Sequence, residues 1–419
     1  MSGAGAEKIA HLQRAVEAAR ARGPAAEGLA LSTLSLAIAG EGEMARARET
    51  LAQAEARVHA AGEATDETGK RDWLRLRAAI ANVRGRMEAS EDAIGRAADS
   101  LAEAAHLASE AGDRELRAEA LLILATVNSS LGKILDGALQ AEEAEDLFVE
   151  SGARTSDVAA RATADRLAAM IAGSDELCAA ADEDLEAERK DGKNPRRLGW
   201  RLRSAAVSFM TMDDEDGLES AYALLEEAGA AFRLAESFSG EARAIRSQGA
   251  CLGALGEATE AADAYLEASA IYAELGAKLP QARAMMEAGH ASRDAEDALR
   301  AAECYEGAAA IFREQESAFE EGFVTEASAD LRRDQGKSAE SRPLYEKALA
   351  LYDGSGLELD DQRAGCLLSL GIACREAGDK EKAQQRLGEA RAIYDRVGET
   401  EMVKECDREL RKAGAVGRR

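Results

Sequence analysis

Apolar and small residues recur along the chain at intervals of three and four positions, and glycine interrupts the pattern at regular points. In the stretch 249–276 the pattern predicts one helix, a turn at Gly256 and a second helix. Small residues at Gly249 and Ala261 allow the two backbones to approach closely, and Tyr265 fills the remaining space. The stretch therefore predicts a hairpin of two helices.

The same pattern returns about every 40 residues over most of the chain. Its frame is a small residue in the first helix, an alanine that opens the second helix, an aromatic residue or leucine four positions later, and an alanine three positions after that. The first position of the frame falls at Ser35, Gly85, Ala125, Asp165, Phe209, Gly249, Gly289, Ala329 and Gly371. A period of about 20–50 residues is typical of solenoids, in which each helix pair buries its outer faces against neighbouring pairs.

The spacings between successive copies are 50, 40, 40, 44, 40, 40, 40 and 42 residues. The copy at Asp165 lacks most of the expected residues, and only its spacing supports it. We therefore expect about nine helix pairs, of which the fourth, at 155–190, is degenerate. Amphipathic segments at 6–22 and 401–412 predict a capping helix at each end.

The frame resembles the tetratricopeptide repeat. Leu370 and Gly371, followed by Ala383 and Leu387, match the signature of that family best. Periods above the common length of about 34 residues resemble the long-repeat variety of kinesin light chains and related adaptors. The resemblance covers about residues 28–398. It implies an all-α, right-handed superhelical α-solenoid that works as a binding scaffold and not as an enzyme.

Helix-breaking residues interrupt the pattern after the degenerate pair, at Gly192, Asn194 and Pro195. We therefore expect two lobes, although a single solenoid with one irregular turn is the alternative. The predicted N-terminal lobe, 1–190, has a cap and four pairs, and an irregular connection follows at 191–200. The predicted C-terminal lobe, 201–413, has five pairs and a cap, and it is followed by a disordered tail at 414–419.

Charge narrows the choice of partners. Aspartate and glutamate outnumber lysine and arginine by 79 to 53, which gives a formal net charge of −26. A field of this sign repels nucleic acids and anionic membranes, so we expect neither as a partner. The sequence contains no apolar run of membrane-span or signal-peptide length, and its six cysteines form no Cys-x-x-Cys pair. We therefore expect a cytoplasmic protein with reduced cysteines.

The residue types that carry catalysis or bind metals form no group. The four histidines, His11, His59, His106 and His290, lie in different repeats without a partner at metal-ligand spacing. The acidic run 213–217 lacks the ligand spacing of a calcium loop. Neither a phosphate-binding glycine loop nor a nucleophile elbow is present. We expect no enzyme activity, no metal and no cofactor.

One set of charged side chains repeats with the helix pairs. The family resemblance implies that first helices line a concave groove, and the frame places a row of arginines and one histidine on that wall. These residues are Arg203, Arg243, Arg246, Arg283, His290, Arg293, Arg333 and Arg375. Guanidinium groups bind carboxylates and phosphates through paired hydrogen bonds, so the row predicts a groove for an acidic or phosphorylated peptide.

Two alternatives stay open. The arginines could instead pair with acids of neighbouring first helices and hold the turns together; the candidate acids are Glu287, Asp294, Glu326 and Asp330. The protein could also be a regulator rather than an adaptor, with two lobes that close around a peptide or ligand and switch a separately encoded enzyme. The partner, the pathway and the oligomeric state do not follow from the sequence.

Overall fold

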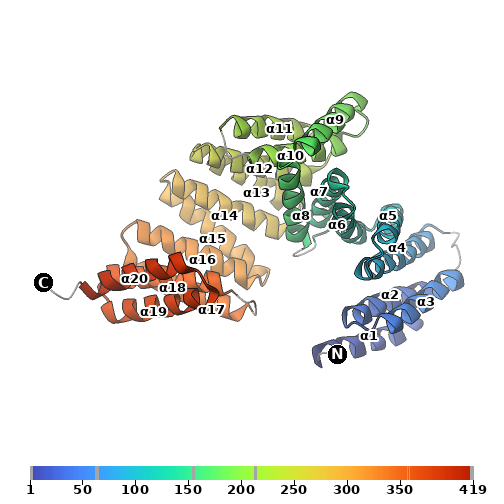
Figure 1. The fold of residues 1–419 in the computed structure, drawn as a ribbon, viewed down its shortest axis with the longest axis horizontal. Helices are drawn as coiled ribbons and strands as arrows, with labels where there is room; N and C mark the ends of the chain where they lie inside the picture. Colours follow the sequence, from blue (N-terminus) through green and yellow to red (C-terminus); the bar gives the residue numbers. More distant parts are fainter. Residues whose placement is uncertain are drawn as a thin grey trace. The chain divides into compact units, whose positions relative to one another are not determined.

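The computed structural model describes residues 3–61, 66–152, 156–211, 215–355, 357 and 359–415, which form twenty α-helices and no strand (Figure 1). Helices α1 (Gly3–Arg20) and α20 (Thr400–Ala415) are the terminal helices. The first helices of the pairs are α2 (Pro24–Gly40), α4 (Glu67–Ser90), α6 (Arg114–Ser130), α8 (Ser156–Ala172), α10 (Pro195–Met210), α12 (Phe238–Ala254), α14 (Lys278–Asp294), α16 (Ala318–Asp334) and α18 (Asp360–Glu376). The second helices are α3 (Met44–Ala61), α5 (Ile94–Ala111), α7 (Ile134–Ser151), α9 (Asp175–Asp191), α11 (Glu215–Leu234), α13 (Ala258–Glu274), α15 (Ala298–Glu314), α17 (Ser338–Gly354) and α19 (Lys380–Val397). The predicted all-α architecture of nine pairs and two terminal helices is confirmed.

The chain divides into two compact units, unit 1 (1–241) and unit 2 (242–419), and the division lies inside α12. The predicted lobes divide at 191–200 and do not coincide with these units. Only three residues separate α9 from α10, and Asn194 caps α10 by accepting a hydrogen bond from the Arg197 amide (3.0 Å). Helix α20 continues to residue 415, and the rest of the predicted tail lies outside the described residues.

Within a pair, a small residue of the first helix lies against a large one of the second. A Cβ added at Gly289 would lie 2.5 Å from Cε1 of Tyr305, and one at Gly371 would lie 2.6 Å from Cγ of Leu387. Side chains do not approach this closely, so these two positions need glycine. The alanine that opens the second helix, such as Ala301, is fully buried. The frame read from the sequence is therefore the packing frame of the helix pair.

The turns between helices use a left-handed residue. Gly256 (φ 84°) and Gly276 (φ 69°) end their helices in this conformation, which glycine adopts without steric cost. Glutamate takes the same place after α14 and α15, at Glu296 (φ 59°) and Glu316 (φ 56°). The turn geometry is thus kept even where the residue does not favour it.

The second helix of the degenerate pair, α9, buries few side chains. Leu185 is the only buried residue among the described residues of α9. Helix α10 packs on α7 as well as on α8 and α9, so it contacts the preceding regular pair in addition to the degenerate one. The loss of signature at 155–190 therefore coincides with a second helix that buries little and with a following helix that also rests on the earlier pair.

A polar seam joins α7 to α10. Its residues are Glu142, Glu145, Asp146 and Glu150 of α7 and Arg196, Trp200 and Arg203 of α10; each set occupies one face of its helix. Arg203 donates to both carboxylate oxygens of Glu142 (2.5 and 2.6 Å) and to Glu145 (3.3 Å). Trp200 Nε1 donates to Asp146 (2.8 Å), and Arg196 pairs with Glu150. The seam is buried at Arg203 and opens toward solvent at Arg196.

Candidate functional site

The structure places the eight predicted groove residues in both units. Arg203 belongs to unit 1 and the other seven belong to unit 2. Arg203 is 3% exposed and lies in the polar seam, and Arg243 is 2% exposed. A ligand needs accessible donors, so the structure corrects the assignment of these two arginines to an open groove wall. The binding role of the other residues stays a prediction.

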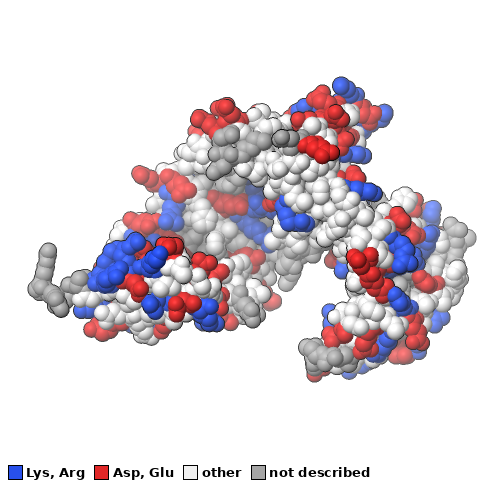
Figure 2. Space-filling view, viewed as in Figure 1, with Lys and Arg blue, Asp and Glu red and all other residues white. Residues whose placement is uncertain are grey.

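The remaining arginines of the predicted row contact acids, mostly on the next first helix. Arg333 differs in pairing with Asp330 of its own helix (3.2 Å). The pairs between helices are Arg246–Glu287 (2.5 Å), Arg283–Glu320 (3.4 Å), Arg293–Asp334 (2.8 Å) and Arg375–Glu409 (3.1 Å). These contacts agree with the alternative in which arginines join successive turns. On the face seen in Figure 2, basic and acidic side chains are interspersed in the same way.

Arginine, histidine and aromatic side chains share one surface of unit 2, which we call the first-helix face. It consists of Arg283, His290 and Arg293 of α14 and Phe323, Asp330 and Arg333 of α16. The rings of His290 and Phe323 meet edge to face with centroids 6.3 Å apart, and Phe323 is 41% exposed. Arg283, Arg293 and Arg333 keep 13%, 31% and 22% of their side chains exposed. The face thus combines an accessible aromatic ring with partly accessible guanidinium groups.

Residues of the second helices hold the polar groups of this face in place. The Tyr305 hydroxyl lies 3.0 Å from Nδ1 of His290, and Tyr345 donates to Asp330 (2.5 Å). Burial, together with the nearby Arg293, lowers the pKa of His290. The imidazole is therefore neutral near pH 7 and adds no charge to the face.

A half-buried carboxylate, Glu326, lies on α16. Tyr352 of α17 donates to Glu326 (2.7 Å), and burial raises the pKa of Glu326 to about 7. Hydrogen bonding from the tyrosine and the nearby Arg333 act in the opposite direction but do not cancel the effect of burial. Glu326 therefore titrates close to neutral pH, a property that the spacing of residues in the sequence did not indicate.

The first-helix face offers binding chemistry and no assembled catalytic group. Over the described ranges, no three or more His, Cys, Asp or Glu side chains lie close enough together to hold a metal ion. Burial raises the pKa of Cys251 to about 11 and that of Cys366 further, so these thiols stay protonated. Nor does any helix in the described part of the chain combine the length and apolar character needed to cross a membrane.

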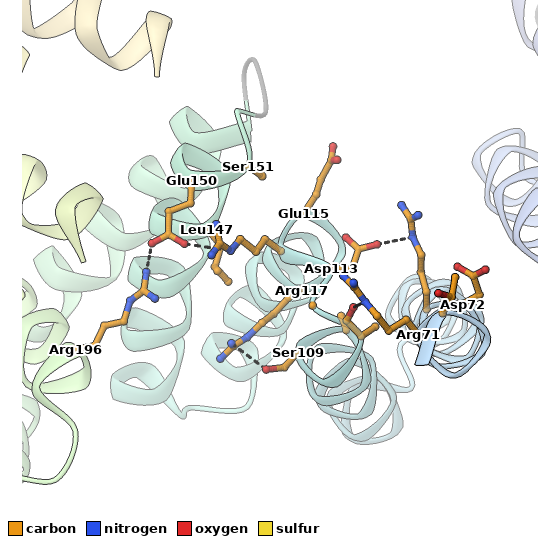
Figure 3. Close-up of a pocket in the computed structure, with 16 residues that line it drawn as sticks. Arg71, Asp72, Ser109, Asp113, Glu115, Arg117, Leu147, Glu150, Ser151 and Arg196 are labelled. Atoms are coloured by element: carbon orange, nitrogen blue, oxygen red, sulfur yellow. Dashed lines mark hydrogen bonds and ion pairs between the residues drawn. The ribbon is translucent and has the colours of Figure 1, made fainter. Parts of the chain in front are cut away.

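Unit 1 contains a polar cavity that the sequence analysis missed (Figure 3). The cavity, which we call the arginine hollow, measures about 750 Å³ and lies among the start of α4, the α5–α6 turn, the end of α7 and the start of α10. Its basic residues are Arg71, Arg75, Arg114, Arg117 and Arg196. All five occur within the first nine residues of a first helix, but every residue of the predicted arginine row lies at position 203 or later, so the row included none of these five. Clustering of arginine at helix starts was the available signal.

Comparison with known proteins supports the repeat assignment. The model of the tetratricopeptide-repeat family matches residues 324–396, which hold the copies anchored at Ala329 and Gly371. No curated protein matches the sequence. A tetratricopeptide-repeat fold supports, in general, a role as a protein-binding scaffold or regulator, because stacked repeats present extended binding surfaces.

The solved structures to which the chain is similar share little sequence identity with it. BtubC (BKLC) from P. vanneervenii is 19% identical, with 52% of this chain and 90% of that chain covered and a TM-score of 0.47. A signal transduction ATPase with numerous domains and a tetratricopeptide-repeat sensor from Pyrococcus horikoshii is 10% identical, with 88% and 51% covered and a TM-score of 0.47. A Rap protein complexed with competence and sporulation factor is 17% identical, with 99% and 98% covered and a TM-score of 0.33.

The family match covers two copies of a frame that recurs along the chain. Most of the described helix pairs follow this frame, with an alanine such as Ala261 or Ala383 fully buried near the start of the second helix. The small-to-large contact between the two helices of a pair also recurs outside the matched residues, as between Gly85 and Leu101. The chain thus contains tetratricopeptide repeats, which the family model matches at residues 324–396 and which other described helix pairs continue in the same frame.

Proposed function

We propose that the protein is a non-enzymatic scaffold that binds a protein or peptide partner along the first-helix face of unit 2. The observation that carries this proposal is the position of Phe323. Its ring is 41% exposed, contacts His290, and lies on the face that also carries Arg283, Arg293 and Arg333. Exposed aromatic rings flanked by arginine are typical of the energetic centre of a binding surface.

The charges indicate the chemistry of the partner. The ion pair of Arg293 with Asp334 is partly exposed, and such pairs contribute only about 0–1 kcal/mol to stability. A carboxylate or phosphate from a partner can therefore replace the internal acid at low cost and gain a charge-assisted hydrogen bond. We infer that the partner segment is acidic or phosphorylated and carries an apolar side chain that covers Phe323.

Selection from a random peptide library tests the proposal. Peptides displayed on phage are selected on the wild-type protein, and the affinity of each selected peptide is measured by fluorescence anisotropy. We expect acidic peptides with one apolar residue to be enriched. Phe323→Ala and Arg293→Glu should each weaken their binding at least tenfold, and higher salt should weaken it further because the charges face solvent.

Leu299→Ala is the matched control. Leu299 is 72% exposed on α15, so this change also removes exposed apolar surface from unit 2, but from a second helix. Its peptide affinity should equal that of the wild type. If the selected peptides bind Phe323→Ala and Arg293→Glu as tightly as the wild type, the first-helix face is not the binding surface.

A further inference from the structure

The arginine hollow of unit 1 differs in charge from the protein as a whole. Its lining holds five arginines and four carboxylates, Asp72, Asp113, Glu115 and Glu150, an excess of one positive charge among the lining residues of a chain with a net charge of −26. Leu147 is the only large apolar residue of the lining. The hollow is therefore suited to a charged, hydrated ligand and not to an apolar one.

The carboxylates of the arginine hollow do not form ion pairs with all five of its guanidinium groups. Arg75 pairs with Asp113 (2.6 Å), whereas Glu150 is shared between Arg196 and the more distant Arg114 (3.6 Å). No carboxylate within the described residues lies in ion-pair range of Arg71. This side chain donates instead to the carbonyl of Ala111 at the end of α5 (3.3 Å). Several N–H donors of the hollow are thus left for a ligand.

The arrangement brings these donors together from separate helices. Figure 3 shows Arg71 and Asp113 on one side of the hollow and Arg196 and Glu150 on the other, with Arg117 between them. Arg117 is held by Ser109 (3.2 Å) and by Glu143 of α7. The carboxylates therefore orient the arginines, and the helices α4, α6 and α10 that carry them are fixed by the repeat packing.

The start of α6 adds a second favourable feature. Asp113 caps this helix by accepting from the Leu116 amide (3.0 Å), and Arg114 is its first residue. The positive end of a helix dipole favours anions and disfavours cations, so an arginine placed there costs free energy in the empty protein. A bound anion would relieve the repulsion between the helix start and the surrounding arginines.

From this combination we infer that the arginine hollow binds a phosphate group. Guanidinium groups match the oxygens of phosphate in paired hydrogen bonds, and several of them can balance a doubly charged group. The volume of about 750 Å³ lies in the range of sites for whole small molecules, which fits a phosphorylated metabolite of nucleotide size. A phosphorylated side chain of a partner protein presents the same chemistry. The site is separate from the face proposed for unit 2.

Isothermal titration calorimetry of the full chain tests the inference with three probes: sodium pyrophosphate, adenosine diphosphate and a phosphoserine peptide. We expect one site per chain, and binding that weakens as salt rises. The double variant Arg71→Ala/Arg114→Ala should bind at least tenfold more weakly. Tighter binding of the two small molecules would identify a metabolite as the source of the phosphate, and tighter binding of the peptide would identify a phosphorylated partner.

Arg48→Ala is the control, because the Arg48 side chain is 62% exposed like that of Arg114 and pairs with Glu91 away from the hollow. Its affinity for the probes should be that of the wild type. If the double alanine variant loses helicity by circular dichroism, the variant Arg71→Lys/Arg114→Lys replaces it. Lysine keeps the positive charge but lacks the paired N–H donors of a guanidinium group, so this variant should still bind the probes more weakly. Absence of binding to all three probes, or equal affinity of the wild type and the folded variant, would overturn the inference.

Discussion

Arg203 of α10 donates two hydrogen bonds to Glu142 of α7, and the side chains of both residues are at least 96% buried. The two residues are 61 positions apart, with the degenerate pair α8–α9 between them. Their contact is the buried end of the polar seam. It shows how unit 1 continues past a pair that has lost its signature: the next first helix is anchored on the preceding regular pair.

Removing one partner of this buried contact should destabilise unit 1 strongly. Arg203→Ala leaves Glu142 and Glu145 buried with one positive charge fewer, and breaking a buried ion pair costs about 3–5 kcal/mol. Urea unfolding followed by Trp200 fluorescence measures the loss, because the indole lies in the same seam. The exposed pair of Arg48 is the comparison, since Arg48→Ala should cost only about 0–1 kcal/mol. Equal costs for the two variants would contradict a structural role for the seam.

Two glycine-to-alanine changes should alter the stability of the folded protein in opposite directions. Gly289→Ala places a Cβ 2.5 Å from Tyr305, and overpacking of this kind costs about 1–3 kcal/mol. Gly388→Ala, inside α19, meets no atom within 4 Å and should stabilise by about 0.5–1 kcal/mol, because alanine favours the helix. Thermal unfolding of the two variants checks both signs. A Gly289→Ala variant as stable as the wild type would show that the frame position does not need glycine.

Stability of unit 2 should fall as pH rises from about 5 to 8. Burial raises the pKa of Glu326 from 4.5 to about 7, so the folded state holds a proton that the unfolded state has already released in this range. The contribution of the protonated carboxyl is complete below about pH 4.5 and is lost as pH passes about 7, at a cost of up to about 3 kcal/mol. Thermal melts across this range measure the fall.

Glu326→Gln is the variant that isolates this titration. Glutamine keeps an acceptor for the hydroxyl of Tyr352 and has no proton to lose. Its melting curves should therefore lack the part of the fall that Glu326 causes, and the variant should be more stable than the wild type at pH 8. Parallel pH profiles for the two proteins would show that Glu326 is already ionised in the folded state.

Local opening should begin at α9. This helix buries only Leu185 among its described residues, so few contacts oppose its detachment. Its amides should exchange with deuterium faster than those of α10, whose Trp200 and Arg203 are buried in the seam. Trypsin should cut first at Arg189, Lys190 or Lys193, at the end of α9 and in the turn that leads to α10. Initial cleavage between 241 and 316 would contradict this order.

The repeat architecture could be predicted because its signals are local. A helix shows its buried face every three or four residues, and the contact of Gly289 with Tyr305 joins residues of one hairpin. The unit boundary could not be predicted in this way. Breaker residues such as Pro195 mark where one helix starts, but compactness depends on contacts summed over many helices.

The sequence by itself determined nine helix pairs and their frame, because both follow from a repeat of about 40 residues. Only the tertiary structure decided which charged residues are buried, paired or accessible. Arg203 and Arg283 occupy the same repeat position in the sequence, yet one lies in a buried seam with Glu142 and the other on a partly exposed face beside Glu320. The difference arises because the position of an arginine in its repeat fixes its direction, while the packing of neighbouring repeats fixes what it meets.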